Sequence, residues 1–402
     1  MKDYSVRLTC RLCGDTRLTK LLSFPDTPLA NEYPKDDGFK QDRFPLYLVG
    51  CQGCGHVQLP VVVRPERLFP PDYPYQSGTS PVFEKHLYDL AYSVGDTMRK
   101  GALLDIGCND GTFARLCRER NIQAYGVDPS APSAPWLFQG FFSLKWAKES
   151  GLKEFTSLGI DGERHGEHIS CVTALNVFAH VDNLDDFTQG VAEVLEPDGI
   201  FIFEVGYLPD VVKRGLFATV YHEHVSYHHL TPLVPFFQKH GMFLYDAERI
   251  DSQGGSIRCY VRNCGGFQTQ SKRLQELIAE ENHPSREGLW RGVTELKAHG
   301  KRIGGYLSNF VKQCEGKVCG YGAPAKLTTL LAATNLYPAS ISYVLDDNPL
   351  KVGRFVPGTS IPIVPSSELY ERKPKGVMLF SANFAEEIQA RHSKYKGKWL
   401  VT

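Results

Sequence analysis

The sequence lacks a charge imbalance, a basic block and a long apolar run. Lysine plus arginine number 45, as do aspartate plus glutamate, in a chain of 402 residues. Because proteins that bind DNA or RNA gather cations to neutralise phosphates, bulk nucleic-acid binding is not expected. No apolar run approaches the ~20 residues that span a bilayer, and the first residues, Met1–Arg7, form no apolar signal region. The cytoplasm is therefore the expected compartment, with neither nucleic acid nor a membrane as a partner.

The composition is that of a folded, soluble protein, with 42% hydrophobic and 22% charged residues. A chain of this length exceeds one ordinary core, so two or three domains are expected. The 11 cysteines are too sparse for a small secreted disulfide scaffold.

Four of the cysteines form two Cys-x-x-Cys pairs, each followed by a glycine. Each pair forms a knuckle in which two thiolates face one ion, and two knuckles complete a tetrahedral, structural zinc site. A redox or disulfide role is the weaker alternative, because no thioredoxin-like βαβ pattern surrounds either pair. The predicted zinc ligands are Cys10, Cys13, Cys51 and Cys54.

The turn after the first buried strand lacks the Gly-x-Gly-x-x-Gly motif of dinucleotide-binding folds. The stretch Leu103–Gly111 instead reads Asp-x-Gly-x-x-x-Gly before a helix, and the next strand, Ala124–Asp128, ends in a carboxylate. An acidic strand end repels phosphate, whereas a carboxylate after the second strand suits ribose hydroxyls. Both features resemble the S-adenosylmethionine loop of class I methyltransferases; the alternative is an ordinary doubly wound domain with a glycine-rich turn. The candidate cofactor-binding residues are Asp105, Gly107, Asn109, Gly111, Asp128 and Asn176.

The αβ alternation around this turn predicts a parallel sheet with crossover helices. A helix is expected over 83–99, a fourth strand over 169–176 and a fifth over 199–205, entered by a turn at 195–199. His180 follows the fourth strand, at the sheet edge where open α/β folds bind ligands. A satisfied structural histidine is the competing interpretation.

The segment Pro71–Ser80 contains turn formers, aromatics and hydroxyls, including Tyr75 and Ser77. It is expected to be a loop. Such loops often supply substrate contacts, although tyrosines beside prolines can equally pack a linker.

The segment Thr219–His229 carries five imidazole or carboxylate groups within eight residues, together with two tyrosines. Its spacing differs from the His-Glu-x-x-His of zinc proteases. In an extended segment Tyr221 and Glu223 share one face, while His222 and His224 share the other. A polar network for proton transfer is favoured over a hydrogen-bonded surface cluster.

A second αβ unit follows a strand pair over 244–261 and a long amphipathic stretch over 271–313 that is interrupted at 283–285. It repeats the strand, Gly-x-Gly turn and helix start over Lys317–Thr329, now with Lys326 in the turn. A lysine at this position suits phosphate. Two Rossmann-like units are therefore expected, one for the methyl donor and one for a phosphorylated acceptor.

Together these stretches resemble one family over essentially the whole chain, the bacterial sugar C-methyltransferases that modify keto-deoxysugar nucleotides. The most specific motif is Tyr-His-Glu-His. The resemblance implies an α/β chain: a four-cysteine zinc-binding domain over 1–70, a class I methyltransferase domain with a doubly wound sheet and the active-site segment over 71–265, and a Rossmann-like C-terminal domain for the nucleotide sugar over 266–402. The other stretches that carry it are Thr27–Asn31, Asp105–Gly111, Glu204–Leu208, Gly254–Arg258, Gly320–Lys326 and Leu345–Pro349.

The implied reaction is methyl transfer from S-adenosylmethionine to a ring carbon beside the ketone of a nucleotide-linked 4-keto-6-deoxysugar, at C3 or in some members C5. Such a carbon acid needs a positioned base and donors that stabilise an enolate. In this family reading His224 is the base, Glu223 orients the imidazole network, and zinc is structural, one per chain, in a monomer or homodimer. Tyr221, His180 and Tyr75 bind or polarise the sugar, and Ser77, His222, Lys326 and Tyr321 are further substrate-binding candidates.

Two other function classes stay open at this point. The same fold could methylate oxygen or nitrogen, which needs no enolate stabilisation. A non-catalytic zinc-ribbon binding protein is the less favoured possibility.

Overall fold

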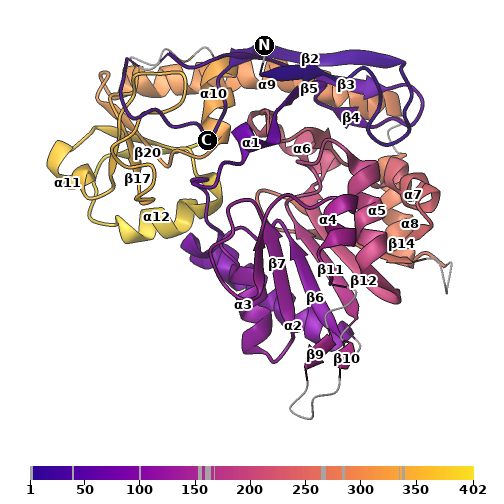
Figure 1. Ribbon diagram of the computed structural model, residues 1–402. Helices are drawn as coiled ribbons and strands as arrows, with labels where there is room; N and C mark the ends of the chain where they lie inside the picture. The colour runs from indigo at the N-terminus through magenta and orange to yellow at the C-terminus, as the bar shows by residue number, and fades with distance from the viewer. Residues whose placement is uncertain are drawn as a thin grey trace.

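Three domains make up the chain in the computed structural model, in which the central domain lies below the N-terminal and C-terminal ones (Figure 1). The structure describes residues 3–38, 40–98, 101–152, 156–158, 164–166, 168–263, 269–282, 286–334, 336 and 340–402. The expected boundary between residues 265 and 266 lies outside these ranges. No helix in the described ranges has both the length and the apolar character needed to cross a bilayer.

The central domain is built on a seven-stranded sheet in the order β14-β15-β12-β11-β6-β7-β8. The first five strands along the chain run parallel, and β15 is antiparallel to both β12 and β14. This order, with one reversed strand next to an edge, is that of class I methyltransferases, as the sequence predicts. The strands are β6 (Ala102–Ile106), β7 (Ala124–Asp128), β8 (Leu137–Gln139), β11 (Ile169–Leu175), β12 (Leu195–Gly206), β14 (Met242–Ile250) and β15 (Ser256–Asn263).

Helices cover both faces of this sheet, because its central strands are apolar on both sides. On one face Leu103 and Cys171 pack against α2 and α3. On the other face Leu104 and Val172 pack with α4, α5 and α7. The helices and short strands of this region are α2 (Pro81–Thr97), α3 (Thr112–Glu119), α4 (Leu144–Glu149), β9 (Thr156–Leu158), β10 (Arg164–Gly166), α5 (Leu184–Val194), α6 (Leu208–Arg214) and α7 (Leu230–Lys239).

The N-terminal domain is an antiparallel sheet, β2 (Leu18–Thr27), β3 (Phe44–Cys51) and β4 (Val57–Gln58), extended by β13 (Ser226–Tyr227) from the active-site segment. A second pair joins β1 (Tyr4–Val6) to β5 (Val61–Val63), followed by α1 (Pro65–Leu68). Leu22 and Phe24 of β2 share a core with Val293 and Leu296 of the long helix α9 (Arg286–Gln313). The N-terminal sheet and α9 lie against each other at the top of Figure 1.

The C-terminal domain is a five-stranded parallel sheet in the order β18-β17-β16-β19-β20. This is the predicted Rossmann-like arrangement. Its elements are α8 (Lys272–Glu281), which packs on β14, then β16 (Val318–Tyr321), α10 (Lys326–Thr334), β17 (Val344–Asp346), β18 (Ile363–Pro365), α11 (Glu368–Arg372), β19 (Gly376–Leu379), α12 (Ala385–Arg391) and β20 (Lys398–Val401).

One local prediction is wrong: β12 begins at Leu195, where a turn was expected. Leu195 pairs with Ile169, and the register then jumps, so that Ile200 pairs with Cys171. Residues 196–199 therefore form a bulge-like irregularity inside β12 rather than a turn before it. A glycine turn joins β14 to β15, with Gly254 and Gly255 at φ 92° and 112°.

Candidate functional site

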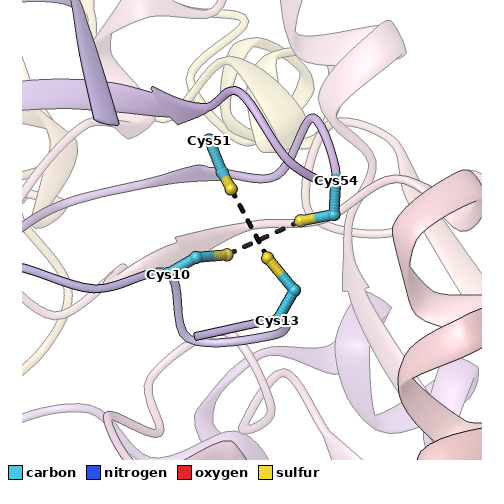
Figure 2. A group of neighbouring side chains, drawn as sticks. All are labelled: Cys10, Cys13, Cys51 and Cys54. Carbon is cyan, nitrogen blue, oxygen red and sulfur yellow. Dashed lines mark hydrogen bonds between the residues drawn. The ribbon is translucent and has the colours of Figure 1, made fainter. Parts of the chain in front are cut away.

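Four cysteine sulfurs converge in the N-terminal domain, all within 4.8 Å of one another (Figure 2). Cys10 Sγ lies 3.6 Å from Cys54 Sγ, and Cys13 Sγ lies 3.5 Å from Cys51 Sγ. A disulfide needs about 2.05 Å between sulfurs, whereas a tetrahedral ion with Zn–S bonds of about 2.3 Å places its sulfurs about 3.8 Å apart. The cluster therefore fits structural zinc.

The two knuckles have the same backbone geometry. Gly14 N–H donates to the Cys10 carbonyl, and Gly55 N–H donates to the Cys51 carbonyl. Both glycines have positive φ, 76° and 87°, which explains why a glycine follows each pair.

The glycine-rich turn after β6 lines a pocket at the carboxyl end of the sheet, together with Ser77 and the α2 residues Phe83 and Leu87. Gly107 and Gly111 have φ of 71° and 78°. A Cβ at Gly107 would lie 2.2 Å from Val177, and one at Gly111 would lie 2.7 Å from Leu137. Both glycines are thus required by backbone conformation and packing, in addition to any ligand approach.

Three acidic or amide side chains stand at the carboxyl ends of neighbouring strands, and one of them, Asp105, lines this pocket. Asp105 is buried, accepts a 2.7 Å bond from Thr173 Oγ1, and has its pKa raised to about 7 by burial. Asp128 ends β7, and its Oδ2 accepts from the backbone N–H of Asn109 at 3.1 Å. Asn176 follows β11 with φ 60°. A pocket with an acidic wall and a carboxylate at the neighbouring strand end fits a cationic, ribose-bearing cofactor such as S-adenosylmethionine.

The loop that contains Tyr75 and Ser77 lies across this turn. Ser77 N–H donates to Asn109 Oδ1 at 2.9 Å, and Asn109 Nδ2 donates to the Tyr75 carbonyl at 3.0 Å. At its other side, Asn348 Nδ2 of the C-terminal domain donates to the Pro74 carbonyl at 3.0 Å. The loop thus contacts both Rossmann-like units, and the linker-only interpretation does not describe it.

The Tyr-His-Glu-His segment is a turn, so the alternation expected of an extended strand is wrong. His224 N–H donates to the Tyr221 carbonyl at 3.0 Å, which brings these two side chains together instead of placing them on opposite faces. Tyr221 Oη lies 2.9 Å from His224 Nε2. His224 Nδ1 lies 2.8 Å from the Thr219 carbonyl, which can only accept. Nδ1 therefore carries the proton, and Nε2 accepts from the phenol.

Burial sets opposite protonation states for this pair. It lowers the pKa of His224 to about 4 and raises the pKa of Tyr221 well above 10. At neutral pH the imidazole is a neutral acceptor and the phenol is a donor. The ring of His180 stacks on His224, with centroids 5.1 Å apart, and on Phe69 at 5.6 Å. Within the described ranges no hydrogen-bond partner is assigned to the His180 ring nitrogens.

Glu223 has other partners than those expected. Its carboxylate accepts from Asn31 Nδ2 at 2.8 and 3.0 Å and from Tyr73 Oη at 2.6 Å. Among the described residues no hydrogen bond joins it to His224, so a direct orienting contact with the imidazole is absent there. Burial raises its pKa to about 7.

Two substrate-binding candidates are buried among protein side chains. His222 is 1% exposed and packs edge-on against Phe44, with Nε2 3.3 Å from the Pro45 carbonyl. Tyr321 is 1% exposed and bonds Asp347 and His392 within the C-terminal domain. Neither geometry supports contact with a substrate.

The turn of the C-terminal unit is held by several partners. Ala323 N–H donates to Asp346 Oδ2 at 2.7 Å, and its carbonyl accepts from Tyr33 Oη at 2.6 Å and Lys351 Nζ at 3.0 Å. Burial lowers the pKa of Lys326 and of Lys351. Two partly desolvated cations beside one glycine turn suit an anionic ligand.

Sequence reasoning missed four residues that the structure places at the site. Asn31 lies in the Thr27–Asn31 motif, and Tyr73 in the loop already singled out. These two residues were within stretches that signalled function, whereas Tyr33 and Lys351 lie outside such stretches, and only tertiary contacts identify all four. The four are Asn31, Tyr33, Tyr73 and Lys351.

Fold and site together define an S-adenosylmethionine-dependent class I methyltransferase with a four-cysteine zinc-binding domain. Family models match a zinc binding domain over residues 10–69, a methyltransferase domain over 87–245 and a C-methyltransferase C-terminal domain over 251–402. The C-methyltransferase NovU of Streptomyces niveus is 30% identical over 396 residues, covering 94% of this chain and 90% of that protein. The chain belongs to the C-methyltransferase family that its motifs resemble.

Two solved methyltransferase structures show a low similarity to this chain. Magnesium protoporphyrin IX methyltransferase from Synechocystis PCC 6803, solved with bound SAH, has 13% identity and a TM-score of 0.30, covering 45% of this chain and 83% of its own. The CcbJ methyltransferase from Streptomyces caelestis has 13% identity and a TM-score of 0.30, covering 44% of this chain and 90% of its own.

Proposed function

We propose that the protein methylates a ring carbon beside the ketone of a nucleotide-linked 4-keto-6-deoxysugar, at C3 or C5, and so forms a branched-chain sugar. The observation that carries this proposal is the Tyr221–His224 pair. A carbon-bound hydrogen beside a ketone needs a neutral base and a hydrogen-bond donor for the developing oxyanion. His224 Nε2 and the Tyr221 hydroxyl have these two states at neutral pH.

The remaining residues orient the base or bind the sugar nucleotide and the cofactor. The Thr219 carbonyl fixes the His224 tautomer, so Nε2 is the basic nitrogen. His180 and Tyr75 contact the sugar, while Lys326 and Lys351 hold the diphosphate beside the turn of the C-terminal domain. When bound, S-adenosylmethionine supplies an electrophilic methyl group, and Asp105, Asp128 and the Gly107–Gly111 turn hold it.

Product analysis tests this function. The protein is incubated with a 4-keto-6-deoxysugar nucleotide and carbon-13-methyl S-adenosylmethionine, and the product is examined by NMR. The proposal predicts carbon coupling between the new methyl and a ring carbon, with loss of that carbon's hydrogen. A methyl on oxygen, with the ring hydrogen retained, would overturn it and favour O-methylation.

A further inference from the structure

The N-terminal domain contacts the segments that form the proposed active site. Arg11, inside the first knuckle, forms an ion pair with Asp182 at 2.9 Å, close in sequence to His180. Tyr33 bonds the Ala323 carbonyl of the C-terminal turn. Strand β4 pairs with β13, which directly follows the Tyr221–Val225 segment. The N-terminal domain thus contacts all three segments.

A fourth contact of the N-terminal domain reaches a catalytic candidate side chain directly. Asn31 Nδ2 donates to both oxygens of Glu223, at 2.8 and 3.0 Å, and lies 3.0 Å from Tyr73 Oη. Tyr73 Oη in turn donates to Glu223 Oε2 at 2.6 Å. The three side chains come from three stretches far apart in the sequence and form a closed set of hydrogen bonds.

We propose that Asn31 and Tyr73 are positioning residues that hold Glu223 as an ionised carboxylate in the active site, so that the zinc-binding domain completes the catalytic machinery. This inference rests on the proposed function. Its chemical basis is the direction of the bonds: each partner donates to Glu223, and donors satisfy a carboxylate better than a protonated acid.

The surroundings of Glu223 explain why these donors matter. Glu223 is 2% exposed, and burial raises its pKa to about 7, whereas the bonds from Tyr73 and Asn31 lower it. The titratable groups whose pKa the Glu223 charge raises are Tyr33 from the zinc-binding domain, Tyr73 from the loop and Tyr221 from its own segment. Burial raises the pKa of each phenol, so all three are neutral at neutral pH. Within the described ranges no cation forms an ion pair with Glu223, which leaves the two hydrogen-bond donors to stabilise its charge.

The pH dependence of the rate should report the ionisation of Glu223. If activity needs the ionised carboxylate, the rate falls as pH drops through the pKa of Glu223, near 7. Removing a donor raises that pKa. A rise of about one pH unit, which corresponds to about 1.4 kcal/mol, reduces the ionised fraction at pH 7 about fivefold. Activity then returns at higher pH, which a merely misfolded variant would not show.

The test compares Asn31→Ala and Tyr73→Phe with wild type across the pH range, measuring kcat, KM and the affinity for S-adenosylmethionine. Arg7→Ala is the control, because it removes another link between the same two domains, to Asp182, without contact with Glu223. Both test variants should move the acid limb of kcat upward by about one unit while cofactor affinity and the control stay unchanged. An acid limb of kcat that stays at its wild-type pH in both variants would overturn the inference.

A second readout needs no sugar substrate. The carboxylic acid band of Glu223, isolated as the infrared difference between wild type and Glu223→Gln, reports its ionisation directly. As the pH is lowered, the band should appear at a higher pH in Asn31→Ala than in wild type. Tyr73→Phe takes the place of Asn31→Ala if Asn31→Ala does not fold. A band shifted to higher pH in a protein that methylates no keto-sugar would refute the proposed function alone. Methylation of the keto-sugar with an unshifted band would refute the positioning role alone.

Discussion

Replacing Tyr221 by phenylalanine removes one hydroxyl from the site and keeps the ring that packs on His224, whose centroid lies 4.1 Å away. The lost hydroxyl is 2.9 Å from Nε2. Loss of a single donor to a developing oxyanion costs about 10²–10³ in kcat, or about 2.7–4 kcal/mol. Loss of the same bond also favours protonation of His224, but burial keeps its pKa below 6.5, so the base stays neutral near pH 7.5. We expect kcat to fall about 100-fold, with unchanged affinity for S-adenosylmethionine.

The assay is single-turnover methyl transfer to the keto-sugar nucleotide, followed by mass spectrometry. Tyr227→Phe is the matched control, because the Tyr227 hydroxyl donates to the Thr219 carbonyl at 3.3 Å and has no assigned bond to Nε2. Its rate should stay close to wild type. A wild-type rate in Tyr221→Phe, or equal losses in both variants, would refute the reasoning that assigns a special role to the phenol at His224.

Three further predictions concern the metal and the two ligands. Cys51→Ser should give insoluble protein or an N-terminal domain sensitive to protease, because zinc binding at such sites contributes folding energy; folded, active wild type without zinc by elemental analysis would contradict this. Asp128→Ala should weaken S-adenosylmethionine binding by about 1–3 kcal/mol in a calorimetric titration, and unchanged affinity would show that this strand end does not hold the ribose. Lys326→Ala should raise KM for the nucleotide sugar and leave cofactor affinity unchanged, whereas the reverse pattern would remove Lys326 from the acceptor site.

The local sequence was sufficient for the sheet, because buried parallel strands and glycine turns are local signals. The four zinc ligands were also readable, since Cys-x-x-Cys spacing alone places two sulfurs on one knuckle. The register irregularity between Leu195 and Ile200 could not be predicted from the sequence, because it depends on how β12 aligns with β11.

The polar site was only partly predictable for the same reason. The pairing of Tyr221 with His224 depends on a turn where an extended segment was expected. The partners of Glu223, Asn31 and Tyr73, lie 192 and 150 residues away, and no local pattern encodes such contacts. His222 shows the converse, because a chemically suitable residue inside a functional motif can pack against Phe44 of the neighbouring domain.

Deuterium exchange tests the central claim most directly, because it separates proton removal from methyl transfer. The protein is incubated in heavy water with the keto-sugar nucleotide and S-adenosylhomocysteine, which fills the cofactor site without a methyl to give. Wild type should incorporate deuterium at the carbon beside the ketone, and His224→Ala should lose both this exchange and methylation by about 10²–10⁴-fold. Exchange and methylation at wild-type rates in His224→Ala would contradict the assignment of His224 as the base.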